Sequence, residues 1–360
     1  MAKIISIGTA VPAYCHQQSA ILQFMQKAYK LGKDDSRKLA YLYNHSDIDK
    51  RYSIVKDFSV AEEEEWNFIP ANATSKSLND RLDLYDEFAL PLSLAAIHDC
   101  LNDQLPINQI THLITVSCTG MTAPGLDLQI TEALNLPANV FRTSVNFMGC
   151  YAAIHALKLA KLICDGETNA NVVIVCTEIC TIHFQQEFTL DNAASGLLFG
   201  DGSAAVLVSN LPTNESTLKL KSFYSEVSHK GKNDMSWKLS DHGFLMKLSA
   251  YIPELIQLDI KAFVGRALAH GEVQQNEITD WCIHPGGKKI LEVIKSQLQL
   301  DASDIATSKE VLWNNGNMSS PTILFVLKEM MKNSTAQTAN IFGVAFGPGL
   351  TMESFIAIKA

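Results

Sequence analysis

Long hydrophobic runs are missing from this sequence. The longest, such as residues 170–175, are no longer than a β-strand, whereas a membrane-spanning helix needs about 18–20 consecutive apolar residues. Residues 1–12 also lack the apolar core of a signal peptide and are typical of a first strand and turn. We therefore expect a cytoplasmic protein without a membrane span.

An excess of positive charge is absent as well. The 29 lysines and arginines are outnumbered by 38 acidic residues, which gives a net charge of −9. A nucleic-acid-binding protein is expected to carry a basic surface, so this balance argues against DNA or RNA as a partner. It still allows a small anionic ligand held by a few local basic residues.

Motifs for metals and nucleotides are also lacking. The eight cysteines form no CxxC pair of the kind that binds zinc, and several lie in apolar stretches, as buried free thiols in a reducing compartment do. The glycine-rich stretches match neither GxxxxGK[ST] nor GxGxxG. We expect no metal and no tightly bound cofactor.

The sequence does contain strand-like runs that alternate with helix-length segments. Valine- and isoleucine-rich runs such as residues 113–117 and 171–176 are typical of the α/β class. A chain of 360 residues has room for about two domains. The polar stretch 210–217 is the best candidate linker, so we predict halves at residues 1–210 and 211–360.

The predicted halves repeat one another. Residues 110–113 resemble residues 278–281 at a shift of 168, and the stretches around Cys150 and Ala170 match others at a shift of 169. Each match is weak, but three in the same order at nearly one offset indicate a duplicated βαβ unit. Equivalent loops would then face each other across a pseudo-twofold axis, and distant residues would meet in one site.

Cys150 is the candidate nucleophile. It follows Gly149 and precedes the largely apolar residues 151–165, which predict a buried helix that stops at Gly166. The positive end of a helix dipole favours the thiolate, which is the reactive form of cysteine. The simpler alternative is a small apolar residue packed at the start of a helix.

Two further loops carry candidate catalytic residues. His284 lies in a His-Pro-Gly-Gly turn between a predicted strand and a predicted helix, Lys288–Leu298, where the glycines permit close approach of a ligand. Asn317 lies just before another apolar helix and is either a catalytic amide or a helix cap. Ser319 or Ser320 can serve as the cap equally well.

Taken in order, these motifs resemble those of the chalcone and stilbene synthases, the type III polyketide synthases, along nearly the whole chain. The clearest parts are Gly149-Cys150, Glu178, residues 198–202, residues 284–287, residues 316–320 and residues 346–351. The resemblance implies an α/β fold of the five-layered αβαβα thiolase-like type with two duplicated halves. It also implies a homodimer that acts on coenzyme A thioesters, with Cys150, His284 and Asn317 as catalytic residues.

The resemblance also assigns pocket residues. Two phenylalanines of the family stand between the coenzyme A tunnel and the reaction cavity, and they match Phe199 and, less closely, Phe244. The other predicted pocket residues are Cys118, Cys180, His183, Ser195, Ser319 and Pro348, and those predicted to bind coenzyme A are Lys38, Gly286 and Lys289.

Several positions depart from the plant enzymes. Tyr41 and His45 replace two members of a basic cluster of which Lys38 remains. The pocket positions that differ are Cys118, Cys180, His183 and Ser195. The bulk of His183 and the small side chain of Cys118 predict a pocket for aliphatic starters, with pyrone, resorcinol or phloroglucinol-type products.

In the predicted reaction, Cys150 takes an acyl group from acyl-CoA, and His284 and Asn317 stabilise the enolate formed when malonyl-CoA loses carbon dioxide. Three alternatives stay open. A 3-ketoacyl carrier-protein synthase III would perform one extension and depend on a carrier protein. A papain-like hydrolase is disfavoured by the absence of Cys-Gly-Ser-Cys. A non-enzymatic partner subunit need not keep all three catalytic residues.

Overall fold

Strands and helices alternate along the chain in the computed structural model, which describes residues 2–69, 76–211, 217–231, 234–249, 251–333 and 338–359. The strands are β1 (Lys3–Ala10), β2 (Tyr14–Gln17), β3 (Lys50–Ser53), β4 (His112–Ser117), β5 (Phe141–Asn146), β6 (Asn171–Ile179), β7 (Asp201–Ser209), β8 (Leu218–Val227), β9 (Met235–Ser240), β10 (Gly243–Leu248), β11 (Asp280–Ile283), β12 (Ala339–Gly347) and β13 (Thr351–Lys359). The α-helices are α1 (Gln18–Ala28), α2 (Lys33–Asn44), α3 (Leu78–Leu101), α4 (Leu126–Ala133), α5 (Ala152–Gly166), α6 (Leu190–Leu198), α7 (Ile252–His270), α8 (Lys288–Leu298), α9 (Ala306–Asn315) and α10 (Thr322–Asn333).

The largest sheet runs through both halves of the chain. Its strand order is β11-β12-β13-β8-β1-β7-β6-β4-β5. The series β4-β6-β7-β1 and the series β11-β12-β13-β8 have the same directions, with one parallel pair followed by antiparallel pairs. Where the two series meet, β1 and β8 are paired only at Lys3↔Lys219 and Ile4↔Leu218. The predicted duplication is therefore confirmed by the strand arrangement.

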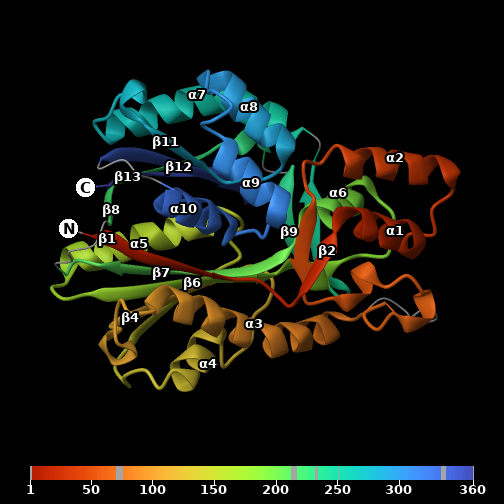
Figure 1. Ribbon diagram of the computed structural model, residues 1–360, viewed down its shortest axis with the longest axis horizontal. Coiled ribbons are helices and arrows are strands. Elements are labelled where there is room, and N and C mark those ends of the chain that lie inside the picture. Colours follow the sequence, from red (N-terminus) through yellow and green to blue (C-terminus); the bar gives the residue numbers. More distant parts are fainter. Residues whose placement is uncertain are drawn as a thin grey trace.

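Helices complete a five-layered αβαβα arrangement, as the resemblance implied. α5 and α10 lie between the two halves of the sheet, while α7 and α8 cover one outer face and α3 and α4 cover the other (Figure 1). The sequence of β6 is continuously apolar because both faces of the strand are buried. Val172 and Ile174 pack in the central cluster with α5, and Val173 and Val175 pack in the outer cluster with α3. A strand buried on both faces needs apolar residues at every position.

The predicted helices and linker have clear counterparts in the structure. The helix predicted at Lys288–Leu298 is α8, and the one predicted after Cys150 is α5. The predicted linker falls between the end of β7 and the start of β8, and its residues 212–216 lie outside the described residues.

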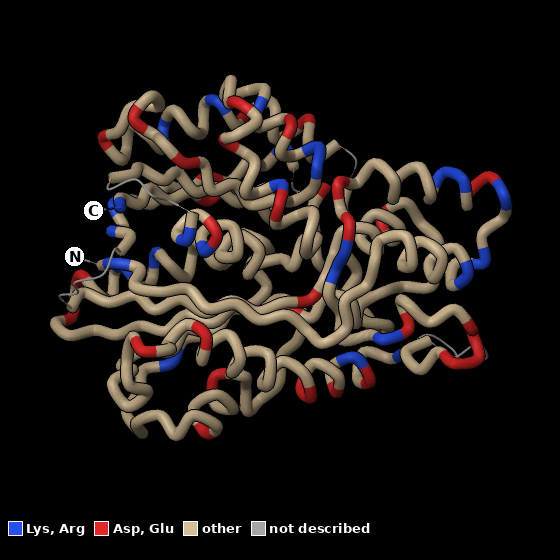
Figure 2. The backbone as a smooth tube through the Cα atoms, viewed as in Figure 1, with Lys and Arg blue, Asp and Glu red and all other residues tan. Residues whose placement is uncertain are grey.

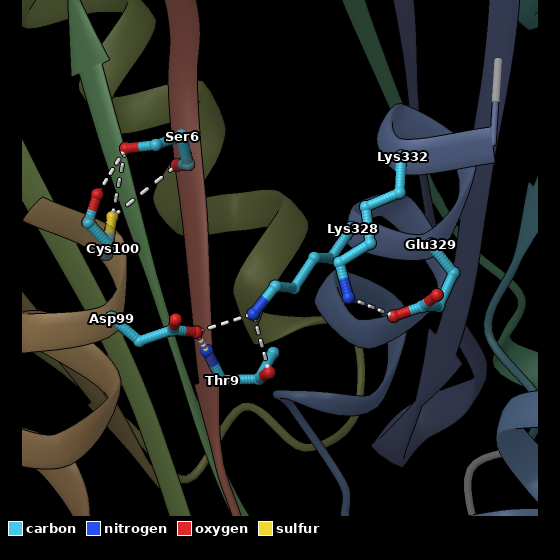
Figure 3. Close-up of polar contacts among 7 residues, drawn as sticks. All are labelled: Ser6, Thr9, Asp99, Cys100, Lys328, Glu329 and Lys332. Atoms are coloured by element: carbon cyan, nitrogen blue, oxygen red, sulfur yellow. Dashed lines mark hydrogen bonds and ion pairs between the residues drawn. The ribbon is translucent and has the colours of Figure 1, made fainter. Parts of the chain in front are cut away.

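Each central helix is tied by one lysine to an inner strand of the opposite half. Lys328 on α10 donates to Thr9 Oγ1 on β1 at 2.9 Å and to Asp99 Oδ2 on α3 at 2.5 Å (Figure 3). Lys158 on α5 donates to Ser225 Oγ on β8 at 2.9 Å. These contacts hold in register the two helices whose N-terminal loops carry the candidate site.

Charges of both signs lie mostly on the outer helices and loops, and the strands between them are largely uncharged (Figure 2). Within the described parts of the chain, no helix combines the length and the apolar character needed to cross a membrane.

Candidate active site

Cys150 lies between β5 and α5, one residue before Tyr151, which is the N-cap of α5. The preceding Gly149 has a φ of +85°, and a Cβ atom there would lie 2.4 Å from Cδ of Pro348. Glycine is required here because the backbone is left-handed and because Pro348 occupies the space of a side chain. The loop after β12 is thereby packed directly against the loop that carries the thiol.

Asn317 faces Cys150 from the equivalent loop of the other half. Its side-chain oxygen accepts a hydrogen bond from the backbone N–H of Ser319 at 2.8 Å, which leaves Nδ2, 4.0 Å from Sγ of Cys150, to donate into the site. Asn317 thus satisfies the N–H of Ser319, which lies in the loop before α10 and not in the helix, and still presents an N–H to the site. Oγ of Ser319 lies 3.7 Å from the same sulfur.

His284 enters the site just beyond the end of β11. Its backbone N–H donates to the carbonyl of Val344 at 2.9 Å, and its carbonyl accepts from the N–H of Gly286 at 2.9 Å, so the turn holds the residue firmly. The side chain is 1% exposed, and neither ring nitrogen has a hydrogen-bond partner among the described residues. Buried polar atoms are normally paired, so these two nitrogens are suited to receiving a substrate.

Burial disfavours the charged forms of both the thiol and the imidazole. Desolvation raises the pKa of Cys150 to about 11, although hydrogen bonds with Ser319 and Asn317 oppose the shift. Desolvation likewise lowers the pKa of His284 to about 3. Desolvation therefore opposes the resting thiolate that the helix dipole favours. We expect deprotonation of Cys150 to accompany its attack on a substrate.

Glu178 joins the loops of the two halves beneath the site. One carboxylate oxygen accepts from the backbone N–H of Cys118 at 2.9 Å and from Oγ1 of Thr119 at 2.8 Å, and the other accepts from Oγ of Ser320 at 2.7 Å. Desolvation raises the pKa of Glu178 to about 7 despite these donors. The residue aligns the loop after β4 with the loop before α10. No group of three metal-binding side chains occurs in the part of the chain that the structure describes.

The three candidate catalytic residues line one cavity, which we call the Cys150 cavity. Other predicted residues in its wall are Cys118, Cys180, Phe199, Gly286, Ser319 and Pro348. Phe147, Trp237 and Met246 also line it, and the sequence did not single them out. They belong to no motif, and only tertiary contact marks them as part of the site.

A second cavity, the His183 cavity, adjoins the first. The two cavities share Cys180, Phe199, Trp237 and Met246. The predicted pocket residues His183, Ser195 and Phe244 line only this second cavity. Phe244 stacks on His183 with ring centroids 4.2 Å apart, and Met246, two residues further along β10, reaches the Cys150 cavity in its place. Phe244 also packs against Phe147 and Trp237, which line the Cys150 cavity, so its predicted role at the reaction cavity stays a prediction.

An open groove of about 1850 Å³, the α8 groove, adjoins the Cys150 cavity on its other side. The two share Leu198, Leu248, Gly286 and Ile290. Lys289, Tyr41 and His45 line the groove, and the rings of Tyr41 and His45 stack with centroids 4.1 Å apart. Lys38 does not line the groove; it is exposed and paired with Asp35 at 2.9 Å.

Known proteins share this architecture. Residues 1–212 match the N-terminal domain of chalcone and stilbene synthases, and residues 219–359 match their C-terminal domain. The chain belongs to this family. It is accordingly an enzyme of the polyketide synthase type, an acyltransferase, as the sequence predicted.

Relatives with these domains occur in several kingdoms. The chain is 28% identical to a putative chalcone synthase of Bacillus subtilis over 98% of this chain and 97% of that protein. It is 27% identical to type III polyketide synthase A of Arabidopsis thaliana, over 99% and 92% respectively. A probable polyketide synthase 1 of Dictyostelium discoideum is 28% identical over 97% of this chain, which spans only 11% of that protein.

Solved structures agree with the fold over the full chain. The structure of PKS-I from the brown alga Ectocarpus siliculosus superposes with a TM-score of 0.91 at 27% identity and covers 100% of this chain and 98% of that one. The C-terminal type III polyketide synthase domain of Steely1, a type I/III hybrid from Dictyostelium, gives a TM-score of 0.90 at 25% identity and 99% coverage of both chains.

Proposed function

We propose that the chain condenses malonyl-CoA, with loss of carbon dioxide, onto an acyl group held by Cys150, repeats the extension and cyclises the product. The observation that carries this proposal is the convergence of Cys150, His284 and Asn317 on one cavity from loops of both halves. A thiol, an imidazole and an amide N–H are the groups that acyl transfer and enolate stabilisation require.

Acyl loading starts from the neutral thiol. As Sγ of Cys150 attacks the carbonyl carbon of the acyl-CoA thioester, its proton passes to His284, whose ring nitrogens are unpaired. The C–S bond to coenzyme A then breaks. Because burial disfavours the imidazolium, His284 hands the proton on to the departing coenzyme A thiolate. The acyl group remains as a thioester on Cys150.

Extension uses Asn317 and His284 as hydrogen-bond donors. When malonyl-CoA loses carbon dioxide, the electrons of the broken C–C bond leave a negative charge on its thioester oxygen. Nδ2 of Asn317 and a ring N–H of His284 stabilise that oxygen, and each such donor is typically worth about 3–4 kcal/mol. The enolate carbon attacks the Cys150 thioester, and the C–S bond breaks to leave a thiolate on Cys150, which takes up a proton from solvent before the next loading. The chain, two carbons longer, leaves on coenzyme A and returns for the next cycle.

Coenzyme A thioesters enter this scheme as substrates, and its steps balance without a metal or a redox cofactor. The α8 groove, with Gly286 and Lys289 in its wall, is the proposed place for coenzyme A because it links the surface to the Cys150 cavity. The proposed starter is an aliphatic acyl-CoA, and the proposed product is a pyrone or a resorcinol- or phloroglucinol-type ring.

We also propose that the enzyme works as a homodimer in the cytoplasm. β5 is the last strand at one side of the sheet, and Phe141 at its start is 67% exposed. Strand edges of this kind readily pair with another chain, so β5 offers a contact for a second copy. Sedimentation of the purified protein tests this proposal, and a species of one-chain mass would contradict it.

Labelled malonyl-CoA and a panel of acyl-CoAs test the proposed reaction. Mass spectrometry of the intact protein should show an acyl adduct that the Cys150→Ala variant lacks. Product analysis should show chains extended by more than one two-carbon unit. A single extension that requires a carrier protein would contradict the proposal, as would an adduct that persists on the variant.

A further inference from the structure

Arg51 is a buried cation that the proposed reaction does not use. It lies on β3 and is only 3% exposed. Its guanidinium donates to neutral oxygens: to Oε1 of Gln18 at 3.0 Å, to the carbonyl of Gly196 at 2.7 Å and to the carbonyl of Phe199. Burial lowers the pKa of Arg51. A buried charge contributes little to the stability of a fold, so we looked to its contacts for a role at the active site.

The carbonyls bound by Arg51 belong to the last turn of α6 and to the residue that follows it. A cation is favoured at this end of a helix, where carbonyls lack partners within the helix. The planar guanidinium bonds the carbonyls of Gly196 and Phe199 at once, so it fixes the direction in which the chain leaves α6. That segment places Phe199 in the wall of the Cys150 cavity.

The same segment is hydrogen-bonded to Asn317. The N–H of Asn317 donates to the carbonyl of Leu198 at 2.9 Å, and the N–H of Gly200 donates to the carbonyl of Asn317 at 3.0 Å. Arg51 also touches the loop from the other side. Gly316 has a φ of +66°, and a Cβ atom there would lie 2.7 Å from Cδ of Arg51. The Arg51 side chain therefore contacts both the segment that leaves α6 and the loop at Gly316, and these two segments meet at Asn317.

We propose that Arg51 is a positioning residue that fixes Asn317, and with it Phe199, for the decarboxylation and condensation steps. The inference rests on the proposed function, since it assigns Arg51 to the step in which Asn317 acts. Lysine cannot replace it, because a single ammonium group cannot reproduce the planar fork that bonds two carbonyls.

Arg51→Lys tests this role. We expect malonyl-CoA decarboxylation and condensation to fall about 10- to 100-fold, as small displacements of a catalytic group do. Acylation of Cys150 by acetyl-CoA should change little, because an acetyl group is too short to reach the His183 cavity that Arg51 also lines. In an Asn317→Ala background, the additional loss from Arg51→Lys should disappear, because the group through which Arg51 acts is gone. Arg266→Lys is the matched control: this arginine is surface-exposed and paired with Glu226, and its replacement should affect neither step.

Equal losses in loading and decarboxylation would overturn the inference, and so would full activity of Arg51→Lys. It would also be overturned if Arg51→Lys lowered decarboxylation by the same factor in the Asn317→Ala background as in the wild type. If Arg51→Lys does not fold, Gln18→Met is the second variant. It removes one acceptor of the guanidinium and the bond from Gln18 to the carbonyl of Leu197 in the same segment, and it should lower decarboxylation selectively but less. A wild-type protein that neither becomes acylated nor decarboxylates malonyl-CoA would contradict the proposed function itself, whatever the variants show.

Discussion

Burial determines the reactivity of Cys150, the residue on which the proposed chemistry depends. With a pKa of about 11, its thiolate fraction is small at neutral pH and grows with pH. The rate of alkylation by iodoacetamide without substrate should therefore rise about tenfold per pH unit between pH 7 and 10. Peptide mass spectrometry of carbamidomethylated Cys150 measures this rate. A plateau already reached below pH 7 would instead indicate a resting ion pair with His284.

Substitutions of Asn317 and His284 should affect acyl loading and malonyl-CoA decarboxylation differently. Asn317→Ala is expected to lower malonyl-CoA decarboxylation about 100-fold or more, the typical cost of one lost donor to a developing oxyanion, and to spare acyl loading. His284→Ala should damage both steps, because the imidazole takes the thiol proton and also donates to the enolate. Acyl adduct formation and carbon dioxide release are measured separately. Equal damage to both steps by Asn317→Ala would mean that the residue only supports the fold.

At the scale of elements, the short segment after β6 separates the two cavities. Cys180 lines both, whereas His183 is fixed in the second by hydrogen bonds between Nε2 and the carbonyl of Thr119 at 2.7 Å and between Nδ1 and the N–H of Phe244 at 3.1 Å. We propose that an alkyl starter extends from the Cys150 cavity past Cys180 into the His183 cavity. Each buried methylene contributes about 0.8 kcal/mol, so its length should matter.

Variants at Cys180 and His183 should shift starter length in opposite directions. Cys180→Phe fills the passage between the cavities and should favour short acyl-CoA starters, whereas His183→Thr enlarges the second cavity and should favour longer or bulkier ones. Relative kcat/KM values for a series of acyl-CoAs, determined on variants with native circular dichroism, measure the shift. If both variants kept the chain-length profile of the wild type, the His183 cavity would be ruled out as the starter site.

For the whole molecule, Glu178 links the two halves and makes stability depend on pH. Its pKa of about 7 in the folded protein lies above the ordinary value of 4.5, so the folded state keeps a proton that the unfolded chain releases. The stability from this shift is complete below about pH 4.5 and is lost as the pH rises through 7. Glu178→Gln removes the ionisable group. Between pH 5 and pH 8 the wild type should therefore lose up to about 3 kcal/mol of its free energy of unfolding that the variant keeps.

Urea unfolding of both proteins at the two pH values measures this difference. Asp201, whose pKa burial raises to about 6, shifts stability in the same direction, but it is present in both proteins and cancels in the comparison. A difference between the proteins that does not change with pH would show that Glu178 is already ionised in the folded state at pH 5.

The sequence predicted the elements well where one physical signal dominated. The continuous apolar residues of β6, the amphipathic α8 and the offset between the halves follow from burial on two faces, burial on one face and duplication, and all three are visible in a single chain. It did not single out Trp237 or Met246, which line both cavities, because neither belongs to a motif. Only contact in space marks them as part of the site.

By itself, the sequence determined the fold class, the duplication and the three loops that carry Cys150, His284 and Asn317, because hydrophobic periodicity and local turn chemistry depend on neighbouring residues. Only the tertiary structure decided the protonation of the thiol, the division of the pocket into two cavities and the contacts of Arg51 with the loop of Asn317. Desolvation, cavity shape and hydrogen bonds between distant segments depend on what surrounds a side chain in space, and sequence order does not contain that information.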